Sequence, residues 1–143
     1  MSQPVTVSVH VRTYLDDYGR LPNNQDLHQF VGKGYYERAI SQFPHDAIFV
    51  VFSDHIEWCK EHFSSIPRIF IYIEAETYYH DLYLMSMCTH NIIANSSFSW
   101  WGAYLNRNPN KIVVAPNRWV NPDWGYRTDD VIPTSWTQIE VDP

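Results

Sequence analysis

The sequence predicts an α/β fold built on a doubly wound, mostly parallel sheet. Apolar runs of strand length alternate with helix-length segments, and most runs are continuously apolar, as in strands buried on both faces. The chain has 143 residues, of which 45% are hydrophobic, and this is enough to form one buried core. No internal repeat or change in composition divides the chain. We therefore expect residues 1–143 to form a single domain.

The first expected strand is "PVTVSVHVR", residues 4–12, in which valines alternate with polar residues at a period of two. Continuous apolar runs predict further strands at residues 47–53, 68–73, 91–94 and 111–115. The segments that favour helices are residues 35–42, 56–63, 77–87 and 97–106. The tail after residue 116 is rich in Pro, Trp and Asp, and it predicts a loop with one short element near Trp136.

Composition excludes several classes of protein. A formal net charge of −6 argues against non-specific binding to nucleic acid or to an anionic membrane, so any anion site must be local. The two cysteines, Cys59 and Cys88, give no disulfide framework and suit a reducing compartment. The sequence shows neither a signal peptide nor an apolar run near the roughly 20 residues that span a bilayer. The expectation is a soluble, cytoplasmic protein.

The fold class predicts where a ligand binds, because open parallel sheets hold ligands outside the carboxyl ends of their strands. One such place is the stretch "HNIIANSSFSWWGAYL", residues 90–105. A strand that ends before Asn95 and a helix that begins near Ser97 leave free backbone N–H groups, with no acidic residue nearby. This pattern predicts an anion site formed with Ser96 and Ser99. The alternative is that Asn95 or Ser96 only caps the helix.

Two more strand ends carry polar residues. His10 and Arg12 point to the same side of the first strand, where Arg can clamp phosphate oxygens and His can donate to a phosphate or a base. Asp54 follows the second strand and either accepts hydrogen bonds from a ribose or guanine or caps the next helix. In the helix at residues 97–106, we expect core packing by Trp100, Trp101, Ala103 and Leu105, with Gly102 allowing close helix–strand contact.

These residues also carry a resemblance to a known family. "HVR", "FSDHIEWCKEHF" and above all "DLYLMSMCTHNIIANSSFSWWGAYLNRNPNKIVVAPNRW", followed by "DVIPTSW", resemble the carboxyl-terminal half of glycosyltransferase family 11, the α-1,2-fucosyltransferases. The resemblance covers essentially the whole chain. It implies a GT-B-type inverting enzyme whose Rossmann-like half binds GDP-fucose as donor and acts on a glycan acceptor, with no metal or other cofactor.

The resemblance also implies roles for particular residues. Arg12 matches the first arginine of the family's H-x-R-R motif and would contact the diphosphate as the catalytic cation. His10 would lie beside the nucleotide, and Asp54 would contact guanine. Ser96, Ser97 and Ser99 would face the phosphates, together with Asn95. The chain departs from the motif at Thr13, where the family has its second arginine, and "RTYLDDYG" replaces the continuation "RRGDY".

The family's amino-terminal half, which builds the acceptor wall of the cleft, has no counterpart in this sequence. We expect that wall to come from another polypeptide, from a homodimer partner, or to be absent. The functions left open are a complete fucosyltransferase or other GDP-sugar transferase, and a nucleotide-binding module without transferase activity. A zinc site of His55, Cys59 and His62 on one helical face is a third alternative. Asp16, Asp17 and Glu74 are candidates for a general base, and none stands out.

Overall fold

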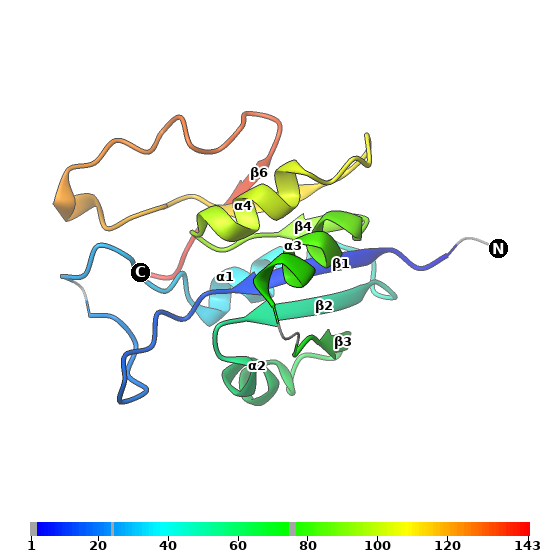
Figure 1. The fold of residues 1–143 in the computed structure, drawn as a ribbon, viewed down its shortest axis with the longest axis horizontal. Helices are drawn as coiled ribbons and strands as arrows, with labels where there is room; N and C mark the ends of the chain where they lie inside the picture. The colour runs from blue at the N-terminus through cyan, green and yellow to red at the C-terminus, as the bar shows by residue number, and fades with distance from the viewer. Residues whose placement is uncertain (1–2, 24, 75–76) are drawn as a thin grey trace.

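The computed structural model describes residues 3–23, 25–74 and 77–143. Its described strands form one six-stranded, all-parallel sheet with the order β3-β2-β1-β4-β5-β6 (Figure 1). The predicted doubly wound sheet is confirmed, and it is parallel throughout. The strands are β1 Thr6–Val11, β2 Ile48–Ser53, β3 Ile69–Tyr72, β4 His90–Ile92, β5 Val113–Pro116 and β6 Thr137–Ile139.

Helices cover both faces of the sheet. They are α1 Lys33–Ile40, α2 Ile56–Phe63, α3 Tyr78–Met87 and α4 Ser97–Tyr104, with a short 3₁₀ turn η1 at Pro122–Trp124. The larger core cluster joins the valines of β1 to buried aromatic residues of α1 and α2, so these two helices share a face. Helices α3 and α4 pack against each other on the opposite face, in front of the sheet in Figure 1.

Both faces of β1 are buried, the one with the valines and the one with the polar residues. Val7, Val9 and Val11 pack into the α1–α2 side of the core, as the period of two predicts. Ser8 and His10 point to the other face, yet both are buried. Helix α3 covers this face, since Asn91 of β4 donates from Nδ2 to both Ser8 Oγ at 2.7 Å and the Met85 carbonyl at 2.9 Å. The polar face of β1 therefore lines the protein interior.

Two elements differ from the prediction where the chain contacts residues that are far away in sequence. The helix expected at residues 35–42 begins two residues earlier, at Lys33, where Asp142 Oδ2 accepts from the Gly34 N–H at 3.0 Å. Gly32 precedes it with φ 97°, a conformation that favours glycine. The short element expected near Trp136 is β6, which pairs in parallel with β5. Pairing at a sheet edge makes a strand of residues with little apolar pattern of their own.

The packing predicted for α4 is partly wrong. Ala103 is buried and Trp100 packs against the second core cluster, as expected. Trp101 and Leu105 are instead 50% and 48% exposed. Gly102 permits a close helix–helix contact, not a helix–strand contact, because a Cβ there would lie 2.9 Å from Met85 Sδ. The reason is that α4 touches the sheet on one side and α3 on another, which leaves its outer side uncovered.

Candidate functional site

The sheet order creates a switch point between β1 and β4. Successive strands run outward from β1 through β2 to β3, and on the other side from β4 through β5 to β6. At such a point the connections diverge and leave a crevice at the carboxyl ends of the two strands. A cavity of about 280 Å³ opens there. Its lining residues are His10, Arg12, Ser53, Asp54, Tyr78, Asp81, Ser96 and Phe98.

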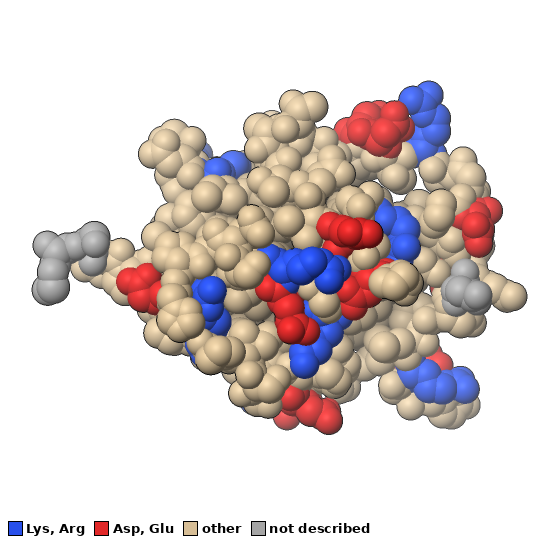
Figure 2. Space-filling view, turned by 180° about the vertical axis from the view of Figure 1, so that it is seen from behind, with Lys and Arg blue, Asp and Glu red and all other residues tan. Residues whose placement is uncertain are grey.

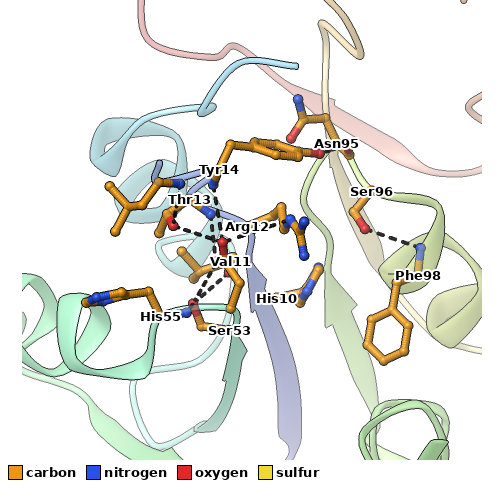
Figure 3. A network of polar contacts seen from close by, with 12 residues as sticks. His10, Val11, Arg12, Thr13, Tyr14, Ser53, His55, Asn95, Ser96 and Phe98 are labelled. Carbon is orange, nitrogen blue, oxygen red and sulfur yellow. Dashed lines mark hydrogen bonds and ion pairs between the residues drawn. The ribbon is translucent and has the colours of Figure 1, made fainter. Parts of the chain in front are cut away.

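The structure therefore brings the three predicted strand ends to one cavity, as Figure 3 shows for β1, β2 and the turn before α4. His10 lies at its floor. The ring is buried and lies 5.5 Å from the Phe98 ring. Within the described part of the chain, its Nδ1 has no hydrogen-bond partner. Loss of hydration on burial lowers the pKa of His10 from 6.5 to about 4, opposed by Asp54 and assisted by Arg12. The imidazole is therefore neutral at pH 7.

Arg12 supplies the cation of the cavity. Its side chain is 47% exposed, and its Nε lies 3.9 Å from Asp54 Oδ2. Its Cζ lies 5.1 Å from the centroid of the Tyr14 ring. Among the residues that the structure describes, its guanidinium makes no hydrogen bond, so its donors are available to an anion. This arrangement agrees with the predicted diphosphate contact, which stays a prediction.

Asp54 organises the loop that follows β1. Its carboxylate accepts hydrogen bonds from Thr13 N at 2.9 Å, from Thr13 Oγ1 at 3.0 Å and from Tyr14 N at 3.2 Å. The alternative that Asp54 caps α2 is wrong, because His55 Nδ1 accepts from the Trp58 N–H at 3.2 Å in that role. A contact from Asp54 to guanine stays a prediction, and the carboxylate would have to make it in addition to these bonds.

The serines after β4 divide into two groups. Ser96 lines the cavity and caps α4, since its Oγ accepts from the Phe98 N–H at 3.2 Å. The capping interpretation is thus confirmed for Ser96. Ser97 is exposed at the first position of α4. Helix α4 has no acidic residue in its own first turn, and the carboxylates that share the cavity with its amino terminus are Asp54 and Asp81.

Asn95 and Ser99 hold the turn from inside. Ser99 is buried, and its Oγ accepts from the Ala94 N–H at 3.2 Å and donates to the Ser96 carbonyl at 3.4 Å. Asn95 is also buried, and its Nδ2 donates to the carbonyls of Gln29 at 2.8 Å and Trp119 at 3.1 Å. The side chains of Asn95 and Ser99 do not line the cavity. Their predicted contact with phosphate finds no support in this geometry.

Sequence reasoning missed several residues of the site. Asp81 lines the cavity from α3, and among the described residues its Oδ1 is a buried oxygen without a partner. Burial raises the pKa of Asp81. The available signal was that Asp81 is the one acid of the mostly apolar and aromatic segment "YYHDLYLMSM". Phe98 and Tyr78 form apolar walls of the cavity, and nothing in their spacing marked them out.

The zinc alternative is not supported. Among residues 3–23, 25–74 and 77–143, no three His, Cys, Asp or Glu side chains lie together as a metal site. Cys59 packs into the core, and burial raises its pKa to about 11, which disfavours the thiolate that binds zinc. His55 caps α2, and His62 Nδ1 lies 2.8 Å from the Trp58 carbonyl.

The general-base candidates lie outside the cavity. Asp16 pairs with Arg20 at 2.9 Å, and Glu74 lies 3.5 Å from Lys60 Nζ. Asp17 is exposed. None of the three contributes to the cavity lining. The carboxylates that line the cavity are those of Asp54 and Asp81.

The fold and the cavity define a class: a doubly wound, Rossmann-like α/β domain with a half-exposed guanidinium and a helix amino terminus at its switch point. The chain belongs to glycosyltransferase family 11, whose model matches residues 2–140. No helix among the described residues is long and apolar enough to cross a membrane. No solved structure gives a significant match.

Relatives with assigned functions agree with this family. The O-antigen biosynthesis glycosyltransferase WbnK of Escherichia coli is 39% identical over 119 residues, which cover 80% of this chain and 39% of the relative. The alpha-1,2-colitosyltransferase of Escherichia coli is 37% identical over 142 residues, 94% of this chain and 48% of the relative. A galactoside 2-alpha-L-fucosyltransferase of Bos taurus is 31% identical over 111 residues, 73% of this chain and 30% of the relative. The chain spans less than half the length of each of these relatives.

Proposed function

We propose that this chain binds the donor of an α-1,2-fucosyltransferase reaction, in which fucose passes from GDP-fucose to a glycan hydroxyl with inversion. The observation that carries the proposal is the meeting of Arg12 with the acid-free amino terminus of α4 at one switch-point cavity. Both features favour a diphosphate, because a guanidinium binds phosphate oxygens in a bidentate manner and a helix amino terminus offers N–H donors. Family membership supplies the substrate class.

The chemistry that follows concerns the leaving group. The bond from the anomeric carbon to the β-phosphate oxygen breaks and its electron pair leaves with GDP, where negative charge grows. The oxygen of an acceptor hydroxyl attacks from the opposite face and gives its proton to a base of the completed cleft. In this proposal Arg12 and the uncapped N–H groups at the start of α4 stabilise that charge, and removal of one such donor costs about 100-fold or more in rate. His10, neutral at pH 7, can donate one hydrogen bond without adding charge. Asp81 can accept from a base or sugar through its unpaired oxygen.

A second function is a donor-binding module without transferase activity of its own. It is favoured by the size of the cavity, because about 280 Å³ is small for a complete nucleotide sugar with its acceptor. In this function a partner domain or a second copy of the chain would complete the cleft. One relative is named a colitosyltransferase, so colitose is the rival donor sugar.

Calorimetric titration with GDP tests the donor site. The wild type should bind, and Arg12→Ala should weaken binding roughly 30-fold, or about 2 kcal/mol, as expected for a charge-assisted phosphate contact. Arg20→Ala is the matched control, because Arg20 lies outside this cavity and pairs with Asp16. Equal affinity in the Arg12→Ala variant and the wild type would contradict the assigned role. Release of GDP from GDP-fucose that depends on an added glycan separates the enzyme from the binding module.

A further inference from the structure

Tyr14 has an unusual backbone. Among the described residues it is the one non-glycine residue with positive φ, at 56°. A left-handed conformation costs a non-glycine residue free energy, and it persists where the surrounding contacts hold it. Here the position directly follows Arg12 and Thr13 on the rim of the proposed donor site. Tyr14 does not itself line the cavity, so it acts on the site through its contacts with Arg12 and Asn95.

Contacts on three sides hold Tyr14. Its hydroxyl donates to the Asn95 carbonyl at 2.7 Å, which joins the end of β1 to the turn before α4. Its ring stacks on the His28 ring at 5.3 Å with an interplanar angle of 15°. Its backbone N–H donates to Asp54 Oδ2 at 3.2 Å. Burial raises the pKa of Tyr14, so the hydroxyl keeps its proton and remains a donor.

The ring of Tyr14 also limits where Arg12 can go. The Arg12 guanidinium lies over it (Figure 3), with Cζ 5.1 Å from the ring centroid. Asp54 Oδ2 lies 3.9 Å from Arg12 Nε. A guanidinium on an aromatic face is attracted by the ring electrons and loses conformational freedom. Thr13, which stands at the second arginine of the motif, points to Asp54 and adds no cation. A single arginine must therefore be held well to act on a diphosphate.

We propose that Tyr14 is a positioning residue for Arg12. Its ring fixes the guanidinium, and its hydroxyl sets the spacing between this cation and the serine turn at the start of α4. The proposal rests on the proposed function, since it assigns Arg12 to the diphosphate of a nucleoside diphosphate. The contact with Tyr14 orients Arg12 in a site that has one arginine where the family motif has two.

Two substitutions test it. Tyr14→Gly removes the ring and suits the positive φ, so the fold should keep its melting temperature within a few degrees. GDP binding should weaken roughly 5- to 10-fold, the scale of a lost cation–π contact that holds a ligand group. Tyr14→Phe keeps the ring and should retain more of the affinity. Tyr18→Ala is the control, because Tyr18 makes the same contact with Arg20, at 5.0 Å, away from the cavity.

A measurement without ligand separates this proposal from the proposed function. The ¹⁵N relaxation of the Arg12 Nε–H group should show an ordered side chain in the wild type and in Tyr14→Phe, and a mobile one in Tyr14→Gly. If the wild type fails to bind GDP while Arg12 still loses order in Tyr14→Gly, the proposed function falls and the positioning role stands. The positioning role is overturned if Arg12 relaxes alike in the wild type and Tyr14→Gly, or if Tyr14→Phe binds GDP as weakly as Tyr14→Gly.

Discussion

His10 should make the stability of this protein depend on pH. The residue is buried, and its pKa falls from 6.5 to about 4 in the folded state. Between these values the unfolded chain binds a proton that the folded chain does not, so folding stability rises with pH across this window. Each pKa unit corresponds to about 1.4 kcal/mol, so the neutral imidazole accounts for about 3 kcal/mol of stability that is present above pH 6.5 and lost towards pH 4.

Urea unfolding at a series of pH values from 4 to 7.5 measures this effect. The variant His10→Gln removes the titrating group and keeps a polar side chain of similar length. It should show a shallower fall in the free energy of unfolding below pH 6.5 than the wild type. His45→Gln is the matched control, because His45 is exposed, and it should keep the slope of the wild type.

The reasoning is refuted if His10→Gln and the wild type lose stability in parallel between pH 6.5 and 4. An NMR titration that finds the His10 ring protonated near pH 6.5 would refute it as well. Either result would mean that water reaches the ring in the absence of ligand. The neutral His10 that the proposed donor site uses would then be charged in mildly acidic solution.

Two further predictions concern packing and the buried polar network. Gly102→Ala should destabilise the protein by about 1 kcal/mol in thermal unfolding, because the new Cβ would lie 2.9 Å from Met85 Sδ and 3.0 Å from Met85 Cβ, and the loss should be smaller in a Met85→Ala background, which keeps only the Cβ contact. Asn106→Leu should lower the free energy of unfolding in urea by more than about 2 kcal/mol. It breaks Nδ2 bonds to the Cys88 carbonyl at 2.9 Å and Asn91 Oδ1 at 2.8 Å. Asn110→Leu, on an exposed turn, is its control, and equal effects would contradict the role of the network.

The fold could be predicted to a large extent because its signals are local. Alternating valines define β1, and the continuous apolar runs define β2, β3 and β5 without reference to the rest of the chain. Strand ends follow directly from these runs, so the sequence also indicated that His10, Arg12 and Asp54 meet at one edge. The weakest predictions were those for exposed side chains, such as Trp101, since exposure depends on which helix lies alongside.

Within the site, the division between structural and ligand-facing residues came from three-dimensional contacts. Ser96 and Ser99 are the same residue type three positions apart, yet one lines the cavity and the other bonds inside the turn. Asp54 resembled a helix cap in the sequence, and its actual partners, Thr13 and Tyr14, are about 40 residues away. Asp81 reaches the cavity because α3 packs over the polar face of β1, which the sequence does not indicate.

The sequence alone determined the α/β class, the elements that carry polar strand ends, and the resemblance to a glycosyltransferase family, because periodicity and motif are properties of neighbouring residues. Only the tertiary structure decided which face of β1 is covered, which serine lines the cavity and how Tyr14 contacts Arg12. These features depend on contacts between segments far apart in the chain. Such contacts stabilise the protein only when the folded sheet holds the segments together.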